Sequence, residues 1–238
     1  MIAAPLRLAP IAAAALGLLS ACNVVMTEKP LFTQADAAGA PALKPGVWLF
    51  FEEPGCKVDE RQPFTEWPDC AGGGLVGAAE IKGHKQDAPP GQLETAPYVL
   101  ATGDPRVMQI QVDVDVSAHA DVSASGEGVT ANRSSSSSSS HSQPYGYAAI
   151  RPTKLDGQGR IVAFTLWPVQ CGPPPPRDAD GDDTAPATQK LLPGLTMKDG
   201  DPVCTTTSTA ALRAAAKASE AWAPQPPRDA RWLRDAPR

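Results

Sequence analysis

Between Met108 and Ser125 the sequence "MQIQVDVDVSAHADVSAS" alternates at every step between apolar or small residues and polar residues. Successive side chains of a β-strand point to opposite faces, so this pattern predicts a strand with one buried face. Its 18 residues would extend over roughly 60 Å at about 3.3 Å per residue, which exceeds one ordinary strand. We therefore expect the second half, which is rich in small residues, to bend, fray or turn back.

Two further segments predict strands. The aromatic run "GVWLFFEE" (Gly46–Glu53) is typical of a short buried strand. The segment Tyr145–Cys171 predicts a hairpin with arms Tyr145–Arg151 and Arg160–Pro168, because "DGQG" (Asp156–Gly159) between them has the composition of a tight turn. An antiparallel arrangement follows from the hairpin.

After Cys204 the sequence "TTTSTAALRAAAKASEAWAP" predicts an amphipathic helix. Thr and Ser favour its start, Ala favours its interior, and Pro224 ends it. One stripe of this helix would pack on the sheet, and it consists of Leu212, Ala215, Ala216, Ser219 and Trp222. Trp232 and Leu233, nearer the end of the sequence, would form a last strand or a core plug.

Composition agrees with a loop-rich β protein. The chain has 26 Pro and 20 Gly among 238 residues, where average usage would give roughly 30 of the two together. We predict one small β-rich α+β domain, an antiparallel sheet or sandwich with a C-terminal helix and two disulfides. Disordered loops are expected near 126–144, which contains seven consecutive serines, and near 172–187, which is Pro-rich and acidic. A net charge of −5 does not favour a nucleic-acid partner.

Three short patterns resemble ligand sites and are interpreted otherwise. Asp113, Asp115, His119 and Asp121 share the polar face of the long strand, and we interpret that face as solvated. The run "DADGDD" (Asp178–Asp183) lacks the Gly and Glu that a calcium loop needs at its sixth and twelfth positions.

The third pattern is G-x-G-x-x-G, formed by Gly72, Gly74 and Gly77. A dinucleotide fold needs this motif between a strand and a helix, whereas a Trp-Pro-Asp-Cys loop precedes it here. We expect a flexible or bulged segment beside a disulfide. No metal or cofactor is predicted.

The N-terminus has the features of a targeting segment. Arg7 precedes an apolar stretch, Leu8–Ala21, of about 14 residues, which is too short to span a bilayer. The sequence that follows, Leu19-Ser20-Ala21-Cys22, resembles the lipobox of bacterial lipoproteins. That resemblance implies that residues 1–21 are a signal peptide and that Cys22 becomes the acylated first residue of the mature protein. An ordinary signal peptide with a chance cysteine is the alternative.

The resemblance also implies a location. Asn23 stands where Asp would retain an enteric lipoprotein at the inner membrane, so we predict the periplasmic face of the outer membrane. Residues 22–45 are expected to be a lipidated tether ahead of a periplasmic domain at 46–238.

Setting Cys22 aside leaves an even number of cysteines, which suits an oxidising compartment. Three pairings are open, and sequence proximity favours Cys56 with Cys70 and Cys171 with Cys204. No close C-x2–4-C pair is present to favour zinc.

No H-E-x-x-H, P-loop or G-x-S-x-G motif is present. We therefore predict a membrane-anchored cell-envelope lipoprotein with a non-enzymatic binding or structural role. Its partners would be the membrane, through the lipid anchor, and an envelope protein, glycan or lipid. The alternative is a periplasmic hydrolase, for which His119 is the candidate residue.

Overall fold

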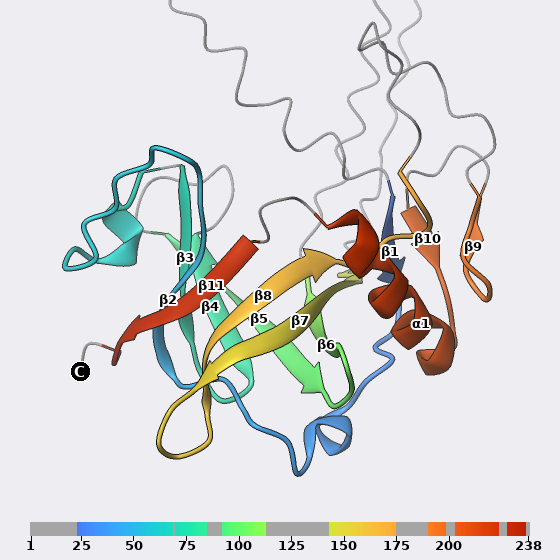
Figure 1. The fold of residues 1–238 in the computed structure, drawn as a ribbon, viewed down its shortest axis with the longest axis horizontal. Helices are drawn as coiled ribbons and strands as arrows, with labels where there is room; N and C mark the ends of the chain where they lie inside the picture. Colours follow the sequence, from blue (N-terminus) through green and yellow to red (C-terminus); the bar gives the residue numbers. More distant parts are fainter. Residues whose placement is uncertain are drawn as a thin grey trace, which may run out of the picture.

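The computed structural model describes residues 23–68, 70–84, 92–112, 143–174, 190–198, 203–223 and 228–236. Eight antiparallel strands follow one another around a closed barrel, and pairing of β6 with β7 completes the closure (Figure 1). These strands are β2 (Gly46–Glu52), β3 (Ala71–Val76), β4 (Glu80–His84), β5 (Leu93–Ala101), β6 (Arg106–Gln111), β7 (Tyr145–Leu155), β8 (Ile161–Pro168) and β11 (Arg228–Arg234). The β-rich fold, the helix and two disulfides are confirmed, and the predicted sheet is a barrel.

The barrel interior is filled with side chains. Trp48 is fully buried, lies 5.3 Å from Phe164 between ring centroids, and donates its indole N–H to Lys44 O. An eight-stranded barrel is just wide enough for side chains to fill it, which these aromatic residues do. The remaining interior side chains are mostly aliphatic: Leu43, Val76, Ile81, Leu100, Met108, Ile150 and Ile161.

Two covers pack on opposite sides of the barrel (Figure 1). One, which we call the helix cover, contains α1 (Thr209–Ser219) with the short strands β1 (Val24–Thr27), β9 (Thr196–Met197) and β10 (Val203–Thr205). The predicted stripe of α1 is buried at Leu212, Ala215, Ala216 and Ser219, and Ser208 caps the helix by accepting from Ala211 N.

The other cover is the segment Glu53–Cys70, which we call the loop cover, with the short helix η4 (Phe64–Glu66). Phe64 and Trp67 are buried in it and pack with Val47 and Leu49 of β2. Both faces of β2 are therefore buried, which accounts for its nearly continuous apolar sequence.

The glycine run forms the strand β3, so it is not a flexible segment, but its pairing with β2 is irregular as expected: the register shifts between Leu49 and Phe51, which lie opposite Gly73 and Gly72. A Cβ on Gly73 would collide with the Trp67 ring, and one on Gly72 would collide with the Phe51 ring. Glycine is required in β3 because aromatic rings lie directly on its backbone. The motif Gly72–Gly77 thus serves packing within the sheet.

The tether expected at 22–45 is also wrong from residue 23 onward. β1 is part of the fold, Val25 is fully buried, and Phe32 and Leu43 are each 2 % exposed. The sequence Asn23–Thr27 is short, its residues are buried at alternate positions, and its partners come from distant parts of the chain. The packed domain therefore begins at Asn23 rather than at Gly46.

The predicted hairpin is confirmed as β7 and β8, and the last strand as β11. The alternating segment forms β6 at its start, but the polar face predicted to be solvated is buried at Gln109, which is 3 % exposed. Gln109 Oε1 accepts from Leu31 N and Phe32 N, and Nε2 donates to Phe32 O. Most of the predicted disordered loops, and the acidic groups at 113–121 and 178–183, lie outside the described residues.

Candidate functional site

The candidate site is the end of the barrel at which the chain enters the fold. Cys22 lies outside the described residues, and Asn23 is the first residue described. Asn23 is 8 % exposed, its carbonyl accepts from Cys171 N at 2.8 Å, and its Nδ2 donates to Gly172 O at 2.8 Å. The residue that follows Cys22 is thus held by both its backbone and its side chain.

The next residues are held by strands on several sides. β1 fills the fork where β7 and β8 separate: Met26 pairs with Gly146 of β7, and Val25 N donates to Val169 O beyond β8 at 2.9 Å. β10 runs parallel to β1, with Val25 opposite Cys204. The chain from Val24 to Met26 is therefore fixed against the barrel, because its residues pair with β7, with β10 and with the segment after β8.

A disulfide fastens the same place. Cys171 and Cys204 are joined across a sequence separation of 33 and are 0 % and 1 % exposed. Cys171 donates its backbone N–H to Asn23, and Cys204 lies opposite Val25. The disulfide therefore links the segment after β8, on one side of β1, to β10 on the other side.

We call this group of residues the attachment edge: Asn23, Val24, Gln170–Gly172, Lys190, Lys198 and Val203–Cys204. Strand register places Lys198 level with Val203 and Val203 level with Val24. A Cβ on Gly172 would collide with Lys190 O, so Lys190 lies beside Gly172. Lys190 and Lys198 are exposed, and no acidic residue belongs to the part of this edge that the structure describes.

Two acceptors at the attachment edge have no hydrogen-bond partner among the described residues. They are the side-chain oxygens Asn23 Oδ1 and Gln170 Oε1, both of which are shielded from solvent. Buried polar atoms without a partner are few in native structures. Asn23 follows Cys22 directly, and Gln170 pairs with Val24, which is two residues after Cys22. Both acceptors therefore lie close to the point where Cys22 joins the described chain.

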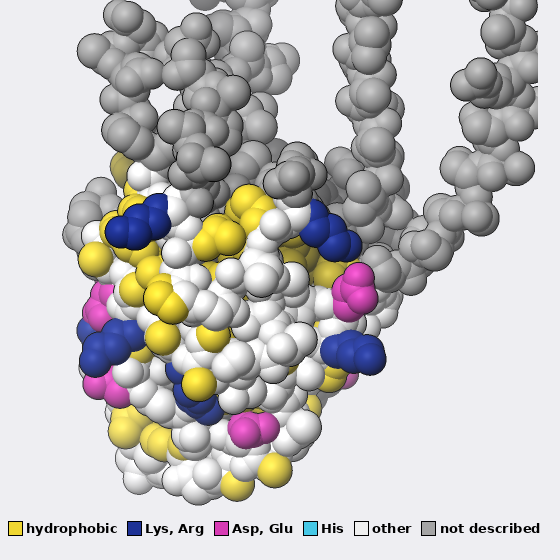
Figure 2. Space-filling view, turned by 90° about the vertical axis from the view of Figure 1, so that its right-hand side faces the viewer, with side chains coloured by type: hydrophobic (Ala, Val, Ile, Leu, Met, Phe, Trp, Pro, Cys, Tyr) yellow, Lys and Arg dark blue, Asp and Glu magenta, His cyan; other side chains and the backbone are white. Residues whose placement is uncertain are grey.

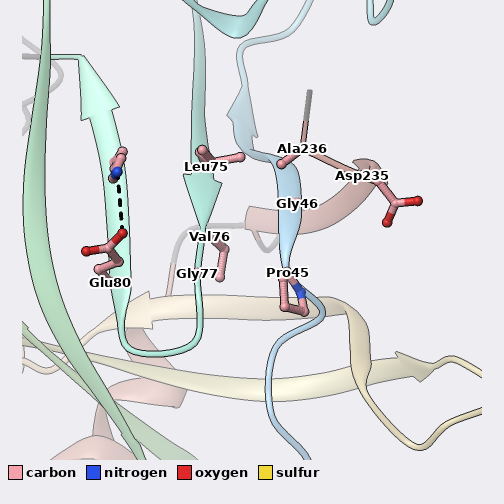
Figure 3. A pocket seen from close by; sticks show the side chains of 9 residues that line it. Pro45, Gly46, Leu75, Val76, Gly77, Glu80, Asp235 and Ala236 are labelled. Carbon is pink, nitrogen blue, oxygen red and sulfur yellow. Dashed lines mark ion pairs between the residues drawn. The ribbon is translucent and has the colours of Figure 1, made fainter. Parts of the chain in front are cut away.

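A cavity of about 300 Å³ lies at the opposite end of the barrel (Figure 3). Pro45, Gly46, Val76 and Gly77 form its base, and Glu80 pairs with Lys82 at 3.5 Å on its margin. Both side chains of that pair are at least 40 % exposed, so water screens the interaction. The cavity is open, and Asp235 adds a second carboxylate to its lining.

A smaller cavity of about 80 Å³ lies between Tyr98, Arg106 and the segment 40–43. Arg106 is 6 % exposed and donates to the carbonyls of Pro41, Leu100 and Ala101. Burial lowers the pKa of Arg106 and raises the pKa of Tyr98 to about 12. Arg106 therefore closes this end of the barrel by satisfying carbonyl groups, and no sequence pattern marks it for that role.

The remaining candidate residues do not assemble a reactive centre within the described ranges. His84 Nε2 lies 3.0 Å from Phe64 O and its ring contacts the Phe64 ring edge-on, so it belongs to the loop cover. The described ranges hold no group of three or more His, Cys, Asp or Glu that could bind a metal ion. None of their helices is long and apolar enough to cross a bilayer.

Sequence reasoning found the four paired cysteines but missed the role of Asn23. Both disulfides join the cysteines nearest in sequence, Cys56 with Cys70 and Cys171 with Cys204. The buried positions of this strand, Asn23, Val25 and Thr27, include two polar residues, so no alternation of apolar and polar residues in the sequence marks a strand next to Cys22. Comparison with protein-family models, with curated proteins and with solved structures finds no match for this chain.

Proposed function

We propose that this chain is a lipoprotein of the bacterial cell envelope, attached to the membrane by acyl groups on Cys22. The observation that carries the proposal is the state of the cysteines. The four that follow Cys22 are joined in two disulfides, which leaves Cys22 as the fifth. Disulfides persist in oxidising compartments such as the periplasm, which is where a lipobox signal would deliver the chain.

The domain binds an envelope protein, glycan or lipid, or supports an assembly, without catalysing a reaction. A barrel filled by Trp48 and Phe164 and stapled on both sides is a rigid scaffold. The hydrolase alternative depends on His119, which lies outside the described residues, and no described feature favours it.

Asn23 supports the periplasmic face of the outer membrane by the same resemblance. The fold supplies an independent reason for Asn at this position, because Nδ2 donates to Gly172 O. An aspartate carboxylate in its place would face that carbonyl without a proton to donate. Retention at the inner membrane and correct packing are thus opposing demands at one residue.

The test is metabolic labelling with radioactive palmitate in a bacterial host, comparing the full chain with Cys22→Ser. We expect the full chain to incorporate label and to sediment with membranes, and Cys22→Ser to do neither. A matched control is a Ser-for-Cys change at Cys56 and Cys70 together, which should still label. Label on Cys22→Ser, or none on the full chain, would overturn the proposal.

A second measurement addresses the binding role. The soluble domain, residues 22–238 with Cys22→Ser, would be exposed to purified envelope proteins, peptidoglycan fragments and lipid vesicles. Specific, saturable binding to one class is expected. Binding to none of the three classes would contradict a binding role.

A further inference from the structure

We infer that the acylated protein sits directly on the bilayer surface, with the attachment edge against the lipid headgroups and the two described cavities facing away from the membrane. This inference rests on the proposed acylation of Cys22. It adds an orientation and a lipid-facing surface, which follow from where the chain enters the fold.

The described chain leaves no tether between Asn23 and the barrel. Asn23 is already buried and hydrogen-bonded to Cys171 and Gly172. One residue spans at most about 3.6 Å, so Cys22 cannot carry its acyl groups far from Asn23. The surface around Asn23 must therefore lie at the depth of the headgroups, because the acyl chains insert just beyond them.

The attachment edge is also held rigidly by its neighbours. β1 is paired with both β7 and β10, and the Cys171–Cys204 disulfide joins the chains on either side of it. An anchor on a frayed segment would let the domain tumble. An anchor fixed within a sheet transmits its direction to the whole barrel.

The opposite end of the barrel is then held away from the lipid. Ile161 and Pro168 are the two ends of β8, and seven steps at about 3.3 Å per residue place them about 23 Å apart, with Cys171 three residues beyond Pro168. Lys44 N donates to Ile161 O, so Ile161 is close to Pro45 and Gly46 of the larger cavity. Leu43, which lines the smaller cavity, is also paired with Ile161. Both cavities thus open at the end remote from Asn23.

The side of the molecule that carries the helix cover is drawn in Figure 2. Hydrophobic side chains gather in its upper half, and Lys and Arg side chains lie on either flank together with Asp and Glu side chains. Figure 1 shows β1, β9 and β10 at the same height, beside α1. Hydrophobic side chains with cations beside them are suited to a membrane interface.

Lys190 and Lys198 are exposed cations at the attachment edge, where they would face the lipid headgroups. Each Lys near an anionic surface contributes about 1 kcal/mol of attraction. Asp199 and Asp201 follow Lys198 in the sequence, outside the described residues. The position of Asn23, and not the local charge, therefore determines the orientation.

The experiment measures depth at two exposed positions of the acylated full-length protein in vesicles of phosphatidylethanolamine and phosphatidylglycerol. A fluorophore is coupled to an azide-bearing amino acid at Pro173, beside the attachment edge, or at Gln158, in the turn between β7 and β8. A spin-labelled lipid headgroup serves as the quencher. We expect quenching at 173 to exceed quenching at 158 several-fold.

A tether insertion is the matched control. About ten Gly and Ser residues placed between Cys22 and Asn23 would have a root-mean-square span of about 18 Å. Quenching at 173 should fall toward the value at 158, while acylation and membrane binding remain.

The outcomes separate the two proposals. Mass spectrometry that finds no acyl groups on Cys22 overturns the proposed function, and this inference with it. If the protein is acylated but quenching is equal at 173 and 158, the inference alone is overturned. The same holds if quenching at 173 does not change when the tether is inserted.

Discussion

The helix cover and the loop cover each carry one disulfide, and the two disulfides hold different kinds of structure. Cys171 and Cys204 are completely buried among the hydrophobic residues that join α1 to the barrel. Cys56 and Cys70 are half-exposed at the base of a largely exposed loop. The first therefore belongs to the core, whereas the second closes a surface segment.

The polar contacts of the two covers differ in the same way. In the helix cover they are buried: Trp167 Nε1 donates to Ala216 O, and Ser219 Oγ accepts from Gln170 N. In the loop cover they are exposed pairs, such as Arg231 with Glu60 at 2.8 Å. Exposed ion pairs contribute little to stability, while buried hydrogen bonds are costly to break. We therefore expect the helix cover to contribute more to the free energy of unfolding than the loop cover does.

Breaking the helix cover should have the largest effect. In the soluble domain, Cys171→Ala with Cys204→Ala opens a loop of 33 residues, for which chain entropy alone predicts a loss of about 4 kcal/mol. Removal of two buried sulfur atoms adds a void, so the loss should be larger still. Urea denaturation followed by tryptophan fluorescence measures it, and a loss below about 1 kcal/mol would contradict the comparison.

Breaking the loop cover should cost less and stay local. Cys56→Ala with Cys70→Ala opens a loop of 14 residues, which corresponds to at most about 3 kcal/mol. Hydrogen exchange should rise in residues 53–70 and remain slow in β7 and β8. A global loss greater than that of the Cys171 and Cys204 variant would reverse the ranking of the covers.

The elements that sequence predicted well are those whose pattern is local. The β7–β8 hairpin has its turn signal in Asp156–Gly159, and α1 has its Ser208 cap and its Leu212 stripe within one segment. Barrel closure was not predictable because β6 meets β7 across residues 113–142, and nothing in either strand encodes that partner.

The errors have the same origin. Gly72–Gly74 indicate flexibility when they are considered alone, and only the positions of Phe51 and Trp67 show why glycine is needed. Asn23–Thr27 lack a local partner, so their burial depends on β7 and β10. In the candidate site, Cys22 and the cysteine pairs have sequence signals, whereas the hydrogen bonds of Asn23 exist only in the folded chain.

Gly73→Ala tests whether the loop cover depends on close packing. An added Cβ would collide with Trp67 and approach Phe64, and overpacking of this kind costs about 1–3 kcal/mol. Gly83→Ala in β4 is the control, because nothing lies within 4 Å of its added Cβ. We expect the control to be neutral or slightly stabilising in urea denaturation. Equal losses in the two variants would show that the rings do not require glycine at position 73.

The smallest expected effect lies in the barrel itself, away from both covers. Hydrogen bonds from the backbone N–H and the side chain of Arg160, together with one from Gln158 N, lower the pKa of Asp156 to about 2 from an ordinary 3.8. A depressed carboxyl pKa stabilises the fold above the ordinary value, and this contribution is lost as pH falls from about 4 to about 2.

Asp156→Asn should therefore lower the urea midpoint slightly at neutral pH and match the wild type near pH 2. The turn contacts neither cover, so the change should add to the effect of either disulfide variant without coupling. A midpoint difference that persists unchanged at low pH would show that the carboxylate charge is not its cause. Strong coupling to the Cys171 and Cys204 variant alone would show instead that the helix cover and the far end of the β7–β8 hairpin unfold as one unit.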